Sequence, residues 1–329
     1  MAPKIVVANR VHEDVTTLLA AYGSLERNWD AEPWSRAELI RRCQDATALM
    51  AFMTESVDED FLAACPNLRM IACALKGYDN FDLAACRRHG VTVSIVPDLL
   101  IAPTAELTIG LIIALGRHIL SSDRYVRGGA FQGWRPTFYG SGLDGSVVGI
   151  VGMGAVGQAI AARLAGFGCA ILYHDTKPLA PDSEARLAAR RVPLDDLLAA
   201  SDTVVVVLPL TAGAIHLIGQ AAIGRMKQGA LLVNTGRGSI VDEQAVADAL
   251  IAGHLGGYAA DVYAMEDWAR PDRPRAIPAG LLAETGRTVL TSHIGSAVDR
   301  VRREIAMQAA RNIIEFLSGR RPAGTVTED

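Results

Sequence analysis

The chain has 329 residues, of which 50% are apolar and 21% are charged, with 32 Lys and Arg against 36 Asp and Glu. This length predicts two domains, and the apolar content excludes a disordered chain. Because a formal net charge of -4 provides no global positive field, we expect neither nucleic acid nor a membrane as a partner.

The five cysteines are odd in number and include no C-x-x-C pair. They predict no disulfide framework and no metal site. The N-terminal run MAPKIVVANR leads directly into a strand-like segment and lacks the apolar core of a signal peptide, so we expect a cytoplasmic protein. The longest apolar stretches, such as 203–210, are far shorter than the roughly 20 residues that span a bilayer.

Short β-branched runs alternate with amphipathic segments in the first hundred residues. The expected strands are 4–8, 48–52, 70–74 and 91–95, and the expected helices are 13–22, 36–43, 59–65 and 82–89. Strands that alternate with helices predict a parallel sheet covered by helices. We therefore expect a flavodoxin-like α/β domain here.

A second α/β set follows a proline-bearing hinge at 96–98 and a long helical pattern at 104–121. Its expected strands are 147–151, 170–174, 203–208, 230–234, 257–262 and 289–292. Six strands fit a doubly wound Rossmann sheet. The final helical pattern, 298–317, is long enough to cross back to the first domain. We therefore predict a discontinuous substrate domain, 1–99 with 297–329, and a nucleotide-binding domain, 100–296.

A G-x-G-x-x-G motif stands between a strand and a helix of the second set. It consists of Gly152, Gly154 and Gly157. Such glycines permit a tight turn and a close approach of backbone to pyrophosphate, and Asp175 stands 18 residues later where a ribose-binding acid is expected. Because a carboxylate there would repel the extra phosphate of NADP, the sequence predicts NAD as cofactor. Lys177 could soften that preference, although a solvated lysine is the simpler interpretation.

Three polar residues follow strands of the second set: Arg237, Glu266 and His293. The carboxyl ends of parallel strands line the ligand crevice of such a sheet, so these residues are candidates for chemistry. A single histidine is more often structural, as we expect for His174, but the placement of His293 favours a catalytic base. In the first domain Lys76 ends an apolar strand, and a buried ammonium there must reach solvent or bind an anion.

At these residues the sequence resembles the D-isomer-specific 2-hydroxyacid dehydrogenase family, in the runs GMGAVG, LPLT, NTGRG, AADV and HIG. Longer runs, among them ALKGYDNFD, FQGWRPTFYGSGLD and GGYAADVYAMEDWARPDRPR, are more similar to the phosphite (phosphonate) dehydrogenases within that family. The resemblance covers nearly the whole chain. It implies oxidation of phosphite to phosphate with reduction of NAD, in a homodimer.

The resemblance also implies roles for individual residues. Lys76 and Arg237 match phosphite-binding cations, and His293 and Glu266 match the catalytic pair, in which Glu266 sets the tautomer of the histidine. Other residues matched around the substrate are Met53, Gly77, Ser296 and Arg302, with Trp134 and Tyr139 as rim aromatics and Trp134 supplied by the other subunit. The matched cofactor residues are Thr104, Gly152, Gly154, Ala155, Val156, Gly157, Asp175, Leu208, Pro209, Thr235, Asp261 and Gly295, with Asp261 facing the nicotinamide carboxamide.

Two departures and two alternatives accompany this interpretation. Ser292 stands where the family usually has proline, and the loop between Glu266 and His293 looks one residue longer. A 2-hydroxyacid dehydrogenase would use the same histidine and would bind a carboxylate with Arg237, but it would not require Lys76. An NAD-sensing corepressor shares this fold and would show no steady turnover with phosphite.

Overall fold

The computed structural model describes residues 2–326, which form two compact units. Unit 1 contains the described residues up to Leu100 and from Ala297 onward, and unit 2 is Ile101–Ser296. The sequence predicted domain boundaries after residues 99 and 296. The structure divides the chain after Leu100 and after Ser296.

Unit 1 is built on a five-stranded parallel sheet in the order β2-β1-β3-β4-β5. Its strands are β1 (Lys4–Val7), β2 (Ser24–Arg27), β3 (Ala48–Ala51), β4 (Met70–Cys73) and β5 (Thr92–Ser94). This is the flavodoxin-like order, in which the direction of winding reverses between β1 and β3. The strand β2, which lies at the edge of the sheet, was not predicted from the sequence.

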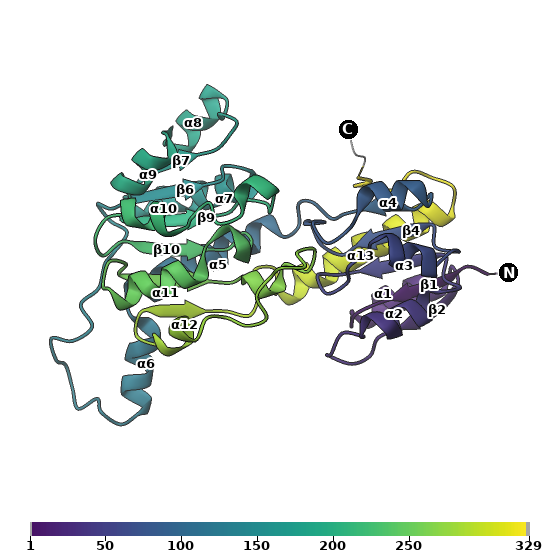
Figure 1. The fold of residues 1–329 in the computed structure, drawn as a ribbon, viewed down its shortest axis with the longest axis horizontal. Helices are drawn as coiled ribbons and strands as arrows, with labels where there is room; N and C mark the ends of the chain where they lie inside the picture. Colours follow the sequence, from purple (N-terminus) through teal and green to yellow (C-terminus); the bar gives the residue numbers. More distant parts are fainter. Residues whose placement is uncertain (1, 327–329) are drawn as a thin grey trace. The chain divides into compact units, whose positions relative to one another are not determined.

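Helices cover this sheet, and several begin at a capping side chain. They are α1 (Glu13–Ala20), α2 (Arg36–Cys43), α3 (Glu59–Ala64), α4 (Leu83–Arg88) and α13 (Asp299–Leu317). The side chains of Ser35, Asp58 and Asp82 accept hydrogen bonds from first-turn N–H groups, which stabilises the starts of α2, α3 and α4. The last helix, α13, packs on β3, β4 and α1, so the C-terminal segment belongs to unit 1 (Figure 1).

Unit 2 is built on a seven-stranded parallel sheet in the order β12-β11-β10-β9-β6-β7-β8. Its strands are β6 (Val147–Val151), β7 (Ala170–His174), β8 (Ala189–Arg191), β9 (Thr203–Val206), β10 (Leu231–Asn234), β11 (Gly257–Ala260) and β12 (Thr288–Leu290). The sequence predicted six strands, and this number was wrong because the short edge strand β8 lacks an apolar run. The winding reverses between β6 and β9.

Helices pack on both faces of this sheet: α5 (Ile101–Gly116), α7 (Ala155–Leu164), α8 (Pro181–Leu187), α9 (Leu194–Ala200), α10 (Gln220–Arg225), α11 (Glu243–Ile251) and α12 (Ala279–Ala283). A further helix, α6 (Ile119–Arg127), contacts α5 and has no buried residue. Alternate residues of each central strand enter two apolar clusters, as expected for a sheet with two buried faces. The helix predicted at 104–121 was wrong in its limits. It begins at Ile101 and breaks at His118, which has a φ of 53°.

Across residues 2–326, the structure contains no single helix with the length and hydropathy required to cross a membrane. Among the described helices, only α5 and α6 taken together meet both criteria, and they are bent by 61° at their junction. Half of α5, including Ile109 and Leu111, is buried in the protein.

Candidate active site

The glycine-rich loop joins β6 to α7 and leaves open space at its centre. Gly152 has a φ of +104°, and a Cβ at Gly157 would lie 2.1 Å from the carbonyl oxygen of Gly152. No heavy atom of the described chain lies within 4 Å of a Cβ built at Gly154. Because no side chain caps α7, the N–H groups of its first turn, which begins with Ala155 and Val156, remain available. The loop therefore fits a dinucleotide pyrophosphate.

Asp175 follows β7 and is hydrogen-bonded to this loop. One carboxylate oxygen, Oδ2, accepts the N–H of Met153 at 2.7 Å, and Oδ1 accepts the N–H of Lys177 at 3.0 Å. The guanidinium of Arg191 donates to the backbone oxygen of Asp175 at 2.9 Å. The side chain of Asp175 is thus fixed beside the glycine-rich loop, where the ribose of a dinucleotide is expected.

His293 and Glu266 form a hydrogen-bonded pair. Nδ1 of His293 lies 2.8 Å from Oε2 of Glu266, and about a quarter of each side chain is exposed. The other oxygen of Glu266, Oε1, accepts the N–H of Tyr263 at 2.9 Å. A carboxylate at Nδ1 favours the tautomer protonated there, and Nε2 has no hydrogen-bond partner in the part of the chain that the structure describes. Nε2 is therefore available as a proton acceptor.

The turn that carries His293 is held by Asp261, which is only 2% exposed. The N–H groups of Ile294 and Gly295 each donate to one oxygen of this carboxylate at 2.8 Å, and Thr291 Oγ1 donates at 2.6 Å. These bonds support the unusual φ of 58° at His293. Both oxygens of Asp261 therefore accept hydrogen bonds from this turn, and its position facing a nicotinamide carboxamide, which the resemblance implies, stays a prediction.

Arg237 follows β10 in a tight turn. The side chain of Asn234 accepts the N–H of Gly236 at 3.1 Å and donates to the backbone oxygen of Arg237 at 2.9 Å. The Arg237 side chain is half-buried, and its Nη1 donates to the carbonyl of Gly236 at 3.0 Å. A charged fork is therefore positioned at the carboxyl end of the unit 2 sheet.

The other cofactor candidates of unit 2 lie near the same strand ends. A buried hydrogen bond of 2.9 Å joins the hydroxyls of Thr235 and Thr108. A Cβ at Gly295 would lie 3.3 Å from the hydroxyl of Thr104, so the His293 turn approaches the start of α5. The segment that follows β9 contains Leu208 and the exposed Pro209, and the half-buried Ser296 ends unit 2.

Four candidates belong to unit 1. Lys76 lies beyond β4, is half-buried, and makes no hydrogen bond or ion pair with any residue that the structure describes; Gly77 follows it. Met53, beyond β3, packs partly against the unit 1 core. Arg302 lies in the first turn of α13, where burial lowers the pKa of its guanidinium. The unpaired ammonium of Lys76 is the chemically distinctive feature of this unit.

Glu55, which was not predicted from the sequence, supports the same strand ends of unit 1. Its carboxylate is 4% exposed and accepts hydrogen bonds from Asn9 and from the backbone of Phe52, and burial raises its pKa. Asn80 donates to the carbonyl of Glu55. These bonds join the loop containing Met53 to the loop that follows Lys76. No motif indicates this role, because it depends on contacts between separate loops.

Trp134 and Tyr139 lie on an exposed segment after α6. Each has 77% of its surface exposed, and α6 itself has no buried residue. Tyr125 packs edge-on against Phe131 and Phe138, which gives the segment its own small aromatic cluster. Such an exposed apolar surface is typical of a protein interface.

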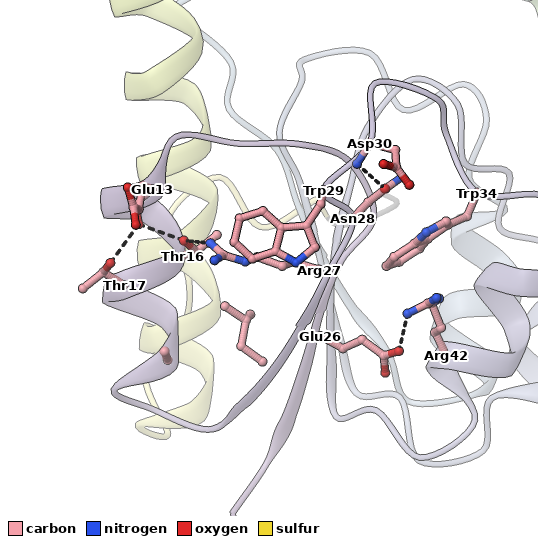
Figure 2. Close-up of a pocket in the computed structure, with 12 residues that line it drawn as sticks. Glu13, Thr16, Thr17, Glu26, Arg27, Asn28, Trp29, Asp30, Trp34 and Arg42 are labelled. Atoms are coloured by element: carbon pink, nitrogen blue, oxygen red, sulfur yellow. Dashed lines mark hydrogen bonds and ion pairs between the residues drawn. The ribbon is translucent and has the colours of Figure 1, made fainter.

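Unit 1 also contains a cavity of about 640 Å³ between α1 and the edge strand β2 (Figure 2). Arg27 lies over the ring of Trp29, and Arg42 lies over the ring of Trp34. Arg42 is also ion-paired with two glutamates, Glu26 and Glu38. None of the site residues predicted from the sequence is among the residues that line this cavity. It is therefore separate from the candidate chemistry.

Comparison with known proteins identifies relatives over the whole chain. The family described as "D-isomer specific 2-hydroxyacid dehydrogenase, NAD binding domain" matches residues 109–295. A glyoxylate reductase of Korarchaeum cryptofilum is 35% identical, covering 100% of this chain and 97% of its own, and one of Thermococcus litoralis is 33% identical, covering 100% and 98%. A solved structure from Thermus thermophilus has a TM-score of 0.88 and 32% identity, covering 98% of this chain and 100% of its own.

These comparisons confirm the predicted α/β fold and the NAD-binding domain. They do not support phosphite as the substrate. Both relatives are named glyoxylate reductase, and neither name mentions phosphite.

Proposed function

The chain belongs to the D-isomer-specific 2-hydroxyacid dehydrogenase family, and from that premise we propose that this NAD-dependent oxidoreductase oxidises phosphite to phosphate. Family membership gives the reaction class and the cofactor. Residues of this chain support the choice of phosphite, as does the resemblance of its longer sequence runs to phosphite dehydrogenases.

Lys76 is the observation that carries this proposal. The ammonium of Lys76 makes no hydrogen bond or ion pair with the described residues, so it is available to bind an anionic ligand. Phosphite carries between one and two negative charges at neutral pH, whereas a 2-hydroxy acid carries one. The resemblance to phosphite dehydrogenases implies that Lys76 and Arg237 both bind the substrate, and two cations match the charge of phosphite better than that of a monocarboxylate.

The proposed reaction converts phosphite, water and NAD⁺ into phosphate, NADH and one proton. NAD, when bound, supplies the acceptor for the hydride that leaves phosphorus. His293 Nε2 accepts the proton of the attacking water, while Glu266 holds the imidazole through Nδ1. Arg237 binds phosphite oxygens through its planar fork, and Asp261 fixes the turn that presents the imidazole.

A substrate screen tests the proposal directly. We expect kcat/KM with NAD to be at least tenfold higher for phosphite than for D-lactate or D-glycerate, because only phosphite uses the charge of both cations. NADH absorbance gives the rates. Comparable rates with D-lactate, or faster reduction of glyoxylate by NADH than oxidation of phosphite, would contradict the choice of substrate.

Substitution of Lys76 tests the observation itself. Lys76→Ala is expected to raise KM for phosphite at least tenfold, since loss of a charge-assisted contact costs about 1.5 to 3 kcal/mol. Lys76→Met, which keeps most of the length and removes the charge, should behave in the same way, and Lys76→Arg should recover part of the loss. Steady-state kinetics at saturating NAD measure the effect. An unchanged KM would mean that Lys76 is a solvated lysine that does not bind the substrate.

A second candidate function is a 2-hydroxyacid dehydrogenase that acts on glyoxylate or a similar 2-oxo acid. The names of the relatives that are 33% and 35% identical favour it. The same chemistry would serve: Arg237 would bind the carboxylate, and His293 would exchange a proton with the substrate oxygen. The substrate screen distinguishes the two functions. Steady turnover of either substrate would exclude a protein that only senses NAD.

We also propose that the protein forms a homodimer, as the resemblance to phosphite dehydrogenases implies. The exposure of Trp134, Tyr139 and the whole of α6 supports this proposal, because burial of that aromatic surface against a second copy would stabilise it.

A further inference from the structure

Two short turns of unit 2 pack backbone against backbone behind the candidate site. The first, η3 (Gly238–Ile240), follows Arg237 directly, and the second, η4 (Ala264–Glu266), carries Glu266. A Cβ at Gly238 would lie 1.8 Å from the carbonyl carbon of Tyr263. Only glycine permits this approach, so the segment with the substrate-binding cation and the segment with the catalytic carboxylate are directly adjacent.

Two buried carboxylates join these turns in opposite directions. Glu243, at the start of α11 and three residues beyond η3, accepts the N–H of Ala264 at 2.8 Å. Asp267, directly after η4, accepts the N–H of Ser239 at 2.8 Å. Glu243 is 5% exposed and Asp267 is 3% exposed. Glu243, which follows η3, therefore anchors η4, and Asp267, which follows η4, anchors η3.

The carboxyl group of Glu243 is in an unfavourable environment. Burial, together with the negative charges of Asp267, Glu266 and Asp242, raises its pKa to about 7. The phenol of Tyr258, on β11, faces the same region, and Oε2 of Glu243 has no hydrogen-bond partner among the described residues. The favourable interaction of this group is the bond to Ala264, in the turn that presents Glu266.

We propose that Glu243 is a positioning residue for the reaction: its carboxyl group holds η4 so that Glu266 keeps His293 in the orientation required of the base. This inference rests on the proposed function, because it takes His293 as that base. The turn sets the position of the Glu266 carboxylate, since Oε1 accepts the N–H of Tyr263 while Oε2 binds His293. A displacement of about 1 Å in such a turn can cost on the order of 100-fold in rate.

Variants of Glu243 separate positioning from general stability. Glu243→Ala should lower kcat at least tenfold with KM for NAD unchanged within twofold. Glu243→Gln, whose amide oxygen can still accept the Ala264 N–H, should recover most of kcat. Glu243→Asp, one methylene shorter, should lower kcat although it retains the charge, and it provides the test if the alanine variant does not fold.

Gln244→Ala is the matched control. Gln244 follows Glu243 in α11 but is exposed, and its side-chain amide donates to Asp248 at 2.9 Å within the same helix. Because this side chain has no contact with η4 and alanine is a strong helix former, the variant should keep the wild-type kcat and KM for NAD.

The outcomes distinguish this inference from the proposed function. If His293→Asn is inactive but Glu243→Ala and Glu243→Asp retain full kcat, Glu243 has no positioning role. Loss of kcat in Gln244→Ala to the same extent as in Glu243→Ala would reduce the effect to a general disturbance of α11 and overturn the inference. Full turnover in His293→Asn would overturn both the proposed base and the role of Glu243 that depends on it.

Discussion

His293→Asn is expected to lower kcat by about 100-fold to 10,000-fold, the range typical of general base catalysis, while the Kd for NAD stays within twofold. Asparagine keeps a polar side chain near Glu266 but cannot take a proton from water at neutral pH. The glycine-rich loop and Asp175, which are expected to bind the dinucleotide, lie on other strands of unit 2. Stopped-flow absorbance for turnover and calorimetry for NAD binding measure the two quantities separately.

His254→Asn provides the control for this experiment. His254 binds the backbone carbonyl of Ile223 through Nε2 at 2.9 Å. It lies between α11 and the amino end of β11, whereas the candidate site lies at the carboxyl ends of the strands. Its replacement should affect stability and leave kcat unchanged. If His293→Asn retained more than a tenth of the wild-type kcat, the proton would have to leave by another route, such as the substrate's own oxygen.

The strands of both sheets were predictable to the extent that they are buried on two faces. The segments 147–151 and 170–174 match β6 and β7 at both ends, because continuous apolar runs mark the buried strands of a parallel sheet. The missed strands β2 and β8 have the sequences SLER and ARR. Both are edge strands whose exposed polar side chains remove the apolar pattern, so only their backbone pairing defines them.

The break between α5 and α6 could not be predicted from periodicity. Apolar residues occur on both sides of the junction, up to Leu115 and again from Ile119, so the helical pattern continues across it. In the structure the carbonyl of Gly116 accepts the N–H of Ser141 at 2.9 Å, and His118 adopts a left-handed φ of 53°. A distant segment of the chain thus takes the hydrogen bond of the next helical turn, and only tertiary structure reveals this.

The residues of the candidate site were also predictable only in part. The rule that ligands bind at the carboxyl ends of parallel strands selected Arg237, Glu266 and His293 from the sequence, and the structure places His293 against Glu266. The same rule could not select Glu243 or Asp267. Their contribution is a hydrogen bond to the backbone of another turn, and backbone acceptors and donors leave no pattern in side-chain identity.

Gly238→Ala is expected to lower both stability and activity, because it disrupts the contact between η3 and η4. The added Cβ would lie 1.8 Å from the carbonyl carbon of Tyr263 and 2.0 Å from the nitrogen of Ala264. Because both are backbone atoms within buried turns, neither can rotate away, and the turns must separate. Overpacking of this kind costs about 1 to 3 kcal/mol or more. At the upper end of that range we expect a fall in Tm of about 6 to 12 °C in a domain of this size.

The same separation would displace Arg237 and Glu266 together, so Gly238→Ala should lose both substrate affinity and kcat in the fraction that remains folded. Gly224→Ala is the matched control: Gly224 is an exposed residue of α10 with no heavy atom of the described chain within 4 Å of its added Cβ. Alanine there should raise stability by up to about 1 kcal/mol through helix propensity and leave kcat unchanged. Differential scanning calorimetry and steady-state kinetics on both variants decide the matter. A Gly238→Ala protein with wild-type Tm and kcat would show that the two turns tolerate separation and that their contact does not set the geometry of the site.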